Sequence, residues 1–245
     1  MLLLAQISDL HLDGTARATE RAAKTVAYLR NLPQPVDALL VTGDIADTAA
    51  PAEYAEAAEL LSDFPAPVLW CPGNHDARPA YREFLLGEPP SAGPINELHK
   101  IKDAVLLMCD SSVPGNDEGL LDDETTAWIR TTLDQHRDAP AFLAFHHPPA
   151  AMHHPLPDAY RLQREAELAE LLSAYPSVVA LITGHAHTAA VSTFAGRPVL
   201  VGPAVTWTLR LPWEGTALAD LDAPPGLAYH VLSDGVLTTH YRVVV

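Results

Sequence analysis

The sequence contains few cysteines and few basic residues. Among its 245 residues are two cysteines, Cys71 and Cys109, and 15 Lys and Arg against 31 Asp and Glu, for a net charge of −16. Two cysteines cannot build a disulfide framework, and both lie in apolar runs, so we expect reduced, buried thiols in a cytoplasmic protein. A surface this acidic repels phosphate backbones and anionic lipids, which argues against nucleic acid or a membrane surface as the partner.

Long apolar runs are also absent. No stretch reaches the roughly 18–20 apolar residues that a membrane-spanning helix needs. The apolar N-terminus is not preceded by a basic residue, and it ends at Ser8 and Asp9 without a small-residue cleavage site. It therefore predicts a buried first strand rather than a secretory signal, in a soluble protein.

Short apolar runs alternate with helical patterns over most of the chain. Six runs rich in Leu and Val predict strands at residues 2–7, 38–42, 68–71, 104–109, 141–145 and 178–183. The stretches between them predict helices at about residues 15–31, 52–63, 79–86, 123–136 and 161–174. Runs without polar alternation are typical of strands covered on both faces, and the alternating order predicts an α/β sandwich.

The last third of the sequence has a different pattern. Short strands are predicted at residues 191–194, 198–201, 227–232 and 236–245, with a hairpin turn at Ser233-Asp234-Gly235. We expect these strands to form an antiparallel set that completes a second sheet. The chain shows no repeat and no linker, so one domain over residues 1–245 is the simplest interpretation.

Five polar motifs follow predicted strands. They are Asp9-Leu10-His11, Gly43-Asp44, Gly73-Asn74-His75-Asp76, His146-His147-Pro148-Pro149 and Gly184-His185-Ala186-His187. Carboxylates, imidazoles and amides are ligands for borderline to hard divalent metals. Residues two apart at the end of a strand point the same way, and a preceding glycine lets the backbone turn sharply. Because ligands gather beyond the carboxyl ends of strands in such sheets, the motifs predict a metal site.

The number of candidate ligands indicates two metal ions. One ion could be held by Asp9, His11, Asp44 and His187. The other could be held by Asp44, Asn74, His146 and His185, with Asp44 as the bridge. Two ions about 3.5–4 Å apart form a clamp for in-line displacement at phosphorus, and their charge would attract an anionic substrate despite the acidic surface. The ligand types leave manganese, iron and zinc open.

In this order and spacing, the motifs resemble the calcineurin-like metallophosphoesterases. Asp110-Ser111-Ser112, Gly119-Leu120-Leu121, the helix around Trp128 and the His146-His147-Pro148-Pro149 run are similar to the class III cyclic-nucleotide and glycerophosphodiester phosphodiesterases. The resemblance covers roughly Leu3 to Thr206. It implies a four-layer α/β/β/α sandwich with two mixed sheets and the ligand set given above.

The resemblance also implies roles for residues that are not ligands. His75 would lie near the leaving group, where it can donate a proton or stabilise charge on phosphate, and Asp76 would orient it. His146 is taken as the ligand because related sequences often have His-x-Pro with the first histidine binding metal. His147, His153 and His154 lie in a Pro-rich loop, and both substrate contact and packing stay open for them.

Simpler explanations exist for single residues. Asp9, Asp44 and Asn74 could each cap a turn. Trp207 and Trp213 follow a predicted strand in a region that often shapes substrate pockets, but packing is the preferred interpretation. Capping explains neither the paired histidines nor five motifs in order, so the metal interpretation is preferred.

The expected activity is hydrolysis of a small phosphodiester. A metal-bridging hydroxide would attack phosphorus without a covalent enzyme intermediate, and the substrate would be 3′,5′-cyclic AMP or a related cyclic nucleotide, then a glycerophosphodiester. A phosphomonoesterase or nucleotide pyrophosphatase with the same metals is an alternative. A non-catalytic scaffold would be expected to have lost ligands, and none is missing. The sequence leaves monomer and homodimer open.

Overall fold

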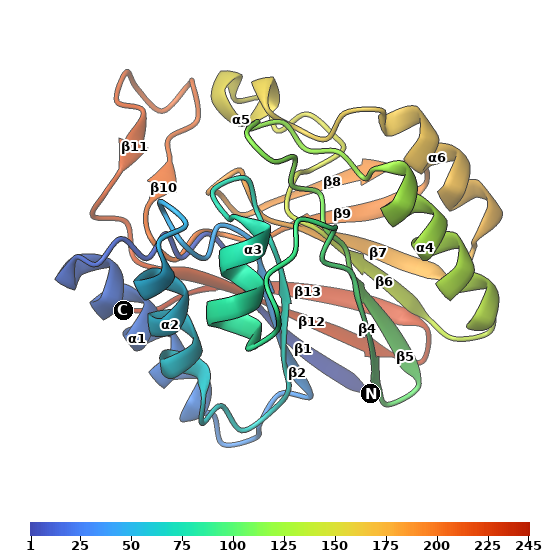
Figure 1. Ribbon diagram of the computed structural model, residues 1–245, viewed down its shortest axis with the longest axis horizontal. Coiled ribbons are helices and arrows are strands. Elements are labelled where there is room, and N and C mark those ends of the chain that lie inside the picture. The colour runs from blue at the N-terminus through green and yellow to red at the C-terminus, as the bar shows by residue number, and fades with distance from the viewer.

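The computed structural model describes all residues from Met1 to Val245. Two β-sheets pack face to face, and helices cover the outer face of each sheet (Figure 1). The first sheet has the strand order β13-β12-β1-β2-β3, and the second has the order β4-β5-β6-β7-β9-β8. The expected α/β/β/α sandwich with two mixed sheets is confirmed.

Parallel strands form one side of the first sheet. These are β1 (Leu2–Ile7), β2 (Ala38–Thr42) and β3 (Val68–Cys71). On the other edge of β1, the hairpin of β12 (Gly226–Ser233) and β13 (Val236–Val243) pairs antiparallel. The outer face is covered by α1 (Ala16–Arg30), α2 (Pro51–Leu61), the short α3 (Arg78–Ala80) and the π-helical turn η1 (Tyr81–Leu86).

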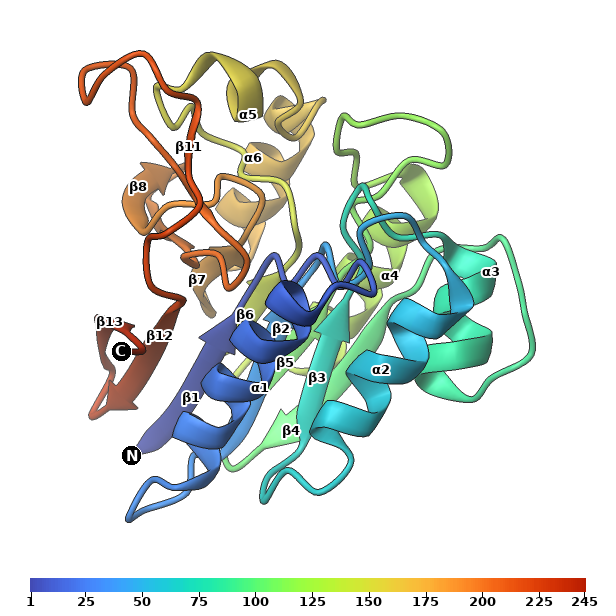
Figure 2. The same cartoon turned by 90° about the vertical axis from the view of Figure 1, so that its left-hand side faces the viewer.

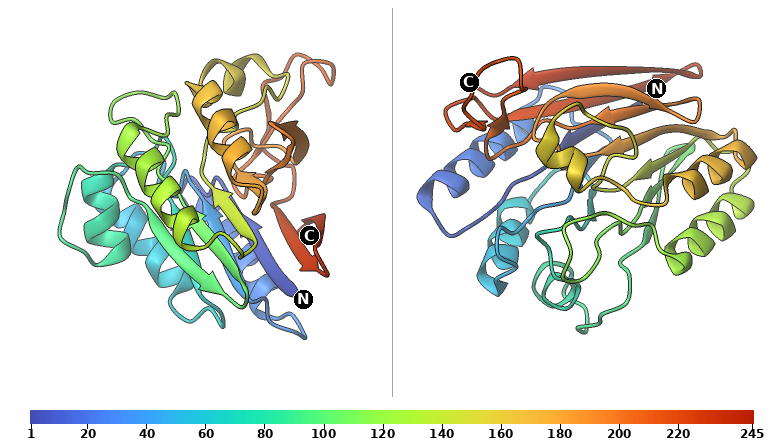
Figure 3. Two further views of the ribbon diagram at one scale, coloured as in Figure 1. Left: turned by 90° about the vertical axis from the view of Figure 1, so that its right-hand side faces the viewer. Right: turned by 90° about the horizontal axis from the view of Figure 1, so that it is seen from above.

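The second sheet also has a parallel centre. Its central strands are β5 (Ala104–Met108), β6 (Ala141–Ala144), β7 (Val178–Thr183) and β9 (Arg197–Val201). Antiparallel edge strands flank them, namely β4 (Glu97–Ile101) and β8 (Ala190–Phe194). Its outer face is covered by α4 (Asp123–Gln135) and α6 (Glu165–Ala174), the green and gold helices of Figure 3.

The C-terminal strands do not form the single antiparallel set that the sequence predicted. β8 and β9 join the second sheet, whereas β12 and β13 extend the first sheet. The expectation was wrong because β1 offers β12 a strand edge that would otherwise be left unpaired. The first and last strands of the chain thus share one sheet.

Four further elements were not predicted from the sequence. They are the edge strand β4, the short helix α5 (Pro155–Ala159), and the two-strand hairpin of β10 (Thr208–Leu209) and β11 (Ala219–Asp220). The helix expected from residue 161 begins only at Glu165, because Arg164 has a left-handed φ of 54°.

Side chains of the central strands alternate between two apolar layers. In β1, Leu2 and Leu4 pack between the sheets, while Ala5 and Ile7 pack toward the helices. Both faces are therefore covered, which explains the unbroken apolar runs. None of the helices has the length and apolar character that crossing a bilayer would require. The parallel strands of the first sheet end on one side of the sandwich, and the polar motifs follow there (Figure 2).

Candidate metal centre

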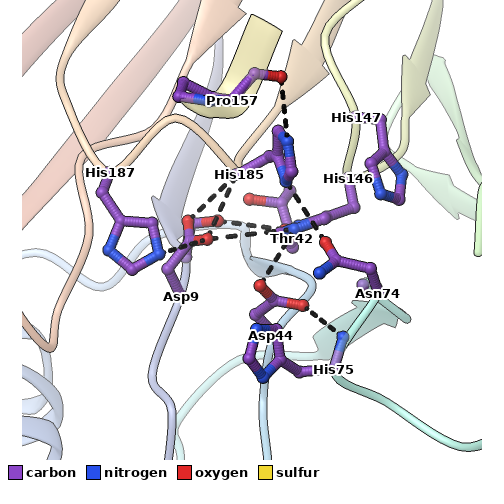
Figure 4. Close-up of polar contacts among 12 residues, drawn as sticks. Asp9, Thr42, Asp44, Asn74, His75, His146, His147, Pro157, His185 and His187 are labelled. Atoms are coloured by element: carbon purple, nitrogen blue, oxygen red, sulfur yellow. Dashed lines mark hydrogen bonds and ion pairs between the residues drawn. The ribbon is translucent and has the colours of Figure 1, made fainter. Parts of the chain in front are cut away.

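The polar motifs meet beyond the carboxyl ends of five strands. Loops after β1, β2, β3, β6 and β7 bring together the seven expected ligands: Asp9, His11, Asp44, Asn74, His146, His185 and His187. Figure 4 shows six of them converging from separate parts of the chain. Asp9 and His146 are completely buried, and Asp44 is 2% exposed. Buried carboxylates and imidazoles are costly unless they are paired, and here they lie against one another at one point.

Strained backbone marks the same loops. Positive φ angles of 43–69° occur at Asp9, His11, Asp44, His185 and His187. Each non-glycine residue in this region costs on the order of 1–3 kcal/mol and persists only when its surroundings hold it. The holding contacts include the amide of Asp9, which donates to Gly43 O at 3.1 Å, and the amide of His11, which donates to Asp44 O at 3.0 Å. Five strained residues in one cluster are typical of a functional site.

Two glycines permit the close approach of these loops. A Cβ atom on Gly43, whose φ is 87°, would lie 2.3 Å from Nδ1 of His146. A Cβ atom on Gly73 would lie 2.2 Å from Oδ1 of Asp44, although the φ of Gly73 is not left-handed. The first glycine therefore serves both the turn and the packing, and the second serves the packing alone.

In the first cluster, the Nε2 atoms of two imidazole rings face each other. His187 donates from Nδ1 to the carbonyl oxygen of Trp207 (3.1 Å), and His11 donates from Nδ1 to Oδ1 of Asp47 (2.9 Å). In the neutral rings, both Nε2 atoms then carry lone pairs, and these atoms are 3.1 Å apart. Oδ1 of Asp9 lies 3.4 Å from Nε2 of His187. A proton on Nε2 of His11 or a metal ion would fill the space between these atoms, and the mixture of nitrogen and oxygen donors fits a metal ion.

The second cluster has the same arrangement. His146 donates from Nδ1 to Thr42 O (2.8 Å), so Nε2 is its free nitrogen, and this atom is buried without a hydrogen-bond partner. His185 donates from Nε2 to Pro157 O (3.3 Å), which leaves the lone pair of Nδ1 facing Oδ1 of Asn74 at 3.2 Å. Each ring is oriented by a carbonyl group on its far side, as metal-binding histidines usually are.

Asp44 lies between the two clusters. Its Oδ2 atom is 3.4 Å from Nε2 of His11 and 3.2 Å from Nε2 of His146. Its Oδ1 atom accepts a hydrogen bond from the amide of His75 at 3.0 Å. One carboxylate oxygen is thus within reach of ions at both clusters.

The titration behaviour of the site follows from burial and charge. Burial opposes ionisation of Asp44, but His146 and His11 hold its pKa well below the usual range. Burial also acts against protonated His11, yet hydrogen bonds to Asp44 and Asp47 raise its pKa to about 10. Burial lowers the pKa of His185 to about 3 and that of His187 well below 6.5. The site therefore combines the Asp44 carboxylate with the neutral imidazoles of His185 and His187 and with a protonated His11, whose proton metal binding would release.

His75 lies at the open side of the metal centre, with its side chain 40% exposed. It is oriented by Asp47: Nδ1 donates to the Asp47 carbonyl oxygen at 2.7 Å, and the Asp47 carboxylate lies 3.9 Å away. The expectation that Asp76 orients His75 is wrong, because the Asp76 carboxylate accepts the backbone amides of Ile45, Ala46 and Gly73. Through these hydrogen bonds, Asp76 links the loop that carries Asp44 to the loop that carries Asn74.

Sequence reasoning missed Asp47. Its carboxylate orients the candidate ligand His11, and its carbonyl group orients His75. The signal was present as a second aspartate three residues after Asp44, but a single Asp in a loop is more often a cap.

The three histidines left open by the sequence do not reach the cavity at the metal centre. His147 is buried, with Nδ1 2.8 Å from Ser111 Oγ. Its nitrogen lies within 4.8 Å of those of His146 and His185, but it does not line the cavity. His154 accepts the amide of Leu156 and caps α5, and His153 is exposed. Packing fits His147 and His154, whereas His153 is exposed and lies outside the cavity.

A cavity of about 410 Å³ opens above the two clusters. Its floor consists of His11, Asp44, Asp47, Asn74, His75, His185 and His187. Its walls are formed by Asp117, by Leu156, Pro157 and Tyr160 around α5, and by Trp207 and Leu209 at the foot of the β10–β11 hairpin. No Lys or Arg lines it. The Trp207 ring stacks on the His187 ring at a centroid distance of 4.0 Å, so Trp207 is a wall residue as well as a packing residue.

Comparisons with known proteins agree with this geometry. The calcineurin-like phosphoesterase family matches residues 2–189. A glycerophosphodiester phosphodiesterase of Enterobacter lignolyticus is 31% identical over 240 residues, covering 94% of this chain and 86% of the relative. A cAMP/cGMP dual specificity phosphodiesterase of Mycobacterium tuberculosis is 31% identical over 247 residues, covering 96% and 77%. The crystal structure of a dimetal phosphatase from Danio rerio superposes with a TM-score of 0.77 at 13% identity, covering 100% and 96%, and supports the fold alone.

The chain belongs to the calcineurin-like phosphoesterase family. This family uses a dinuclear divalent metal site, and the buried His and Asp clusters have the donor set for it.

Proposed function

We propose that the protein is a dinuclear metal-dependent phosphodiesterase that hydrolyses small phosphodiesters, with 3′,5′-cyclic nucleotides as the preferred class. The observation that carries the proposal is the charge of the cavity. Beyond the metal centre it presents two carboxylates, Asp47 and Asp117, and no Lys or Arg side chain. A phosphodiester carries one negative charge, whereas a phosphomonoester near neutral pH carries close to two and a nucleotide pyrophosphate carries more. Because no Arg or Lys lines the cavity, the additional negative charge of a monoester or pyrophosphate would lie near the two carboxylates without a cationic partner.

The two ions would be held by the sets described above. Asp9, His11, Asp44 and His187 would hold one ion, and Asp44, Asn74, His146 and His185 the other, with Asp44 bridging. Bound there, divalent ions supply positive charge for the phosphate oxygens and acidify a water molecule. Manganese, iron and zinc all suit this mixture of nitrogen and oxygen donors.

The chain's own residues would act on the substrate as follows. His75 keeps its Nδ1–H on the Asp47 carbonyl oxygen, so its Nε2 atom is the one placed to pass a proton to the leaving oxygen. Trp207 and Leu209 on one wall and Tyr160 on another offer apolar surface to the organic part of the substrate. Such surface suits a nucleoside, whose base can stack on an aromatic ring.

A glycerophosphodiester is the second candidate substrate. The relative that carries this name matches nearly the whole chain at the same identity as the cyclic-nucleotide relative. Rates on cyclic AMP, cyclic GMP and glycerophosphocholine decide between the two classes.

The charge argument has a direct test. Wild-type protein is expected to hydrolyse bis(p-nitrophenyl) phosphate faster than p-nitrophenyl phosphate. Asp117→Lys adds a cation at the cavity wall and should shift this ratio toward the monoester by about tenfold, the equivalent of about 1.4 kcal/mol. Asp138→Lys makes the same change of charge outside the cavity and should leave the ratio unchanged. A wild-type preference for the monoester would refute the proposal.

The fold supports two further proposals about the whole chain. Residues 1–245 would act as one metallophosphoesterase domain, because β12 and β13 complete the sheet that β1 begins. The protein would work in the cytoplasm, where cyclic nucleotides are found and where its two free, buried cysteines would stay reduced.

A further inference from the structure

The cavity wall formed by Trp207 and Leu209 belongs to an excursion of the chain. Between β9 and β12, residues 206–223 leave the sandwich, form the β10–β11 hairpin and return (Figure 1). The hairpin itself has two paired residues on each strand. Trp213, Leu218 and Leu221 on it are 56–69% exposed, so little of its far end packs on the protein.

The foot of this excursion, residues 206–209, contacts the residues of the metal centre. The Trp207 carbonyl oxygen accepts Nδ1 of His187 (3.1 Å), and the amide of Leu209 donates to the His187 carbonyl oxygen (3.2 Å). The amide of Thr206 donates to the carbonyl oxygen of Asp9 (3.2 Å). The position of this foot therefore determines where the wall stands relative to the reacting phosphate.

Two arginines of α1 hold both ends of the excursion. On the outgoing arm, Nε of Arg21 donates to Val205 O (2.9 Å), and Nη2 of Arg17 donates to Thr206 O (3.0 Å). On the returning arm, the same two guanidinium groups donate to the carbonyl oxygens of Leu221 and Ala223. Arg17 and Arg21 are four residues apart and so lie on one face of α1. A guanidinium has several N–H groups in a rigid fork and can join two carbonyl groups at once.

The returning arm depends on these arginines. From residue 211 to residue 223, the only hydrogen bonds to parts of the protein outside the excursion come from Arg17 and Arg21. The remaining bonds of this stretch stay within it, such as those of Arg210 to Asp220 and to Leu218. Neither arginine lines the cavity.

We propose that Arg17 and Arg21 form a clamp that fixes the Trp207–Leu209 wall over the metal centre and thereby sets the affinity for the organic part of the substrate. They are positioning residues, since they act through the excursion and touch no reacting atom. The effect on substrate rests on the proposed function, whereas the clamp itself can be tested without it.

The first experiment tests the clamp by limited proteolysis. Arg210 is the only Lys or Arg in residues 206–223, so trypsin has one cleavage site there. In Arg17→Ala/Arg21→Ala, cleavage after Arg210 should be at least about fivefold faster than in wild type, because the excursion opens more often. Arg30→Ala removes an arginine of the same helix that binds Leu60 O instead, and should behave like wild type. Equal cleavage rates in all three proteins would overturn the clamp.

The second experiment measures kinetics on bis(p-nitrophenyl) phosphate, together with metal content by mass spectrometry. The double variant should have a KM raised about tenfold with kcat within about threefold of wild type, and two ions per chain. The single variants should show smaller changes of the same kind, which covers the case of a poorly folded double variant. An unchanged KM, or a loss of kcat together with metal, would contradict a role in setting the wall. If the wild type cleaves no diester, the proposed function fails, and the proteolysis result still decides the clamp.

A double-mutant cycle tests whether the clamp acts through Trp207. Arg21→Ala and Trp207→Ala should each raise KM, and the double variant should resemble Trp207→Ala alone. Additive effects on KM would show that Arg21 acts by another route and would overturn this part of the proposal.

Discussion

The floor and the walls of the cavity are built in different ways. The floor lies on loops that follow strands of both sheets, most of its expected metal ligands are buried, and its strained backbone is held by hydrogen bonds between these loops. The walls lie mainly around the short helix α5 and on the β10–β11 hairpin, where Leu156 and Trp213 are exposed although Leu209 is buried. A rigid floor suits chemistry that tolerates little displacement, and attached walls can vary without disturbing it. Substitutions in the floor should therefore lower kcat or metal content, and substitutions in the walls should alter KM.

The strongest test of this difference is at the centre of the floor. Asp44→Asn removes the negative charge that faces both clusters, while it preserves the size of the side chain. Activity should fall by at least about three orders of magnitude, since metal-ion catalysis contributes several kcal/mol. Metal content should fall as well, from two ions per chain. A variant that retains both ions and normal diesterase activity would show that Asp44 does not bridge.

A smaller effect is expected at the edge of the floor. His75→Ala should keep both ions, because His75 contacts Asp47 and the Asp44 carboxylate only through Nδ1 and its amide. The rate should fall by about 10²–10⁴-fold, the usual contribution of a proton donor. A nitrophenolate can leave without being protonated. The rate of hydrolysis of a nitrophenyl diester should therefore fall less in this variant than the rate for cyclic AMP. Loss of an ion from this variant would make His75 a ligand.

Asp47 contacts both a candidate metal ligand, His11, and the candidate proton donor, His75. Asp47→Ala removes the acceptor of His11 Nδ1–H but keeps the backbone carbonyl group that holds His75. The affinity for one of the two ions should fall by about 10–100-fold, the usual cost of losing such a partner. Titration with limiting metal should then fill one site before the other. Asp63→Ala, at an exposed aspartate outside the cavity, is the matched control. Equal weakening of both sites would contradict the assignment of His11 to a single ion.

Most of the floor could be predicted from the sequence, Asp47 being the exception, and most of the walls could not. Asp9, Asp44 and His185 follow apolar strands directly, so the strand pattern and the parallel arrangement place them together. Trp207 and Tyr160 follow no such rule, because hydrogen bonds from distant groups set the conformation of their loops. Arg17 resembles any exposed residue of an amphipathic helix until its partners some 190 residues later are known.

The misassigned residues show the same limit. Asp76 was expected to orient its neighbour His75, but adjacency along the chain does not establish contact, and the three amides that it accepts belong to two different loops. The β12–β13 hairpin was correctly recognised, but which sheet edge it joins depends on the whole topology. The local sequence pattern predicts which helices and strands form, whereas pairing between distant segments determines which strands are neighbours in a sheet.

The smallest expected effect lies in the wall itself. Trp207→Ala deletes the ring that stacks on His187 and lines the cavity, but it keeps the backbone carbonyl group that orients His187. KM for a cyclic nucleotide should therefore rise about tenfold, with kcat and the two ions retained, because base–aromatic stacking is worth about 1–3 kcal/mol. Trp213→Ala, on the same hairpin but 69% exposed and outside the cavity, should change neither constant. If Trp207→Ala lost metal instead, the ring itself would be part of the floor, and the division between floor and wall would have to be drawn elsewhere.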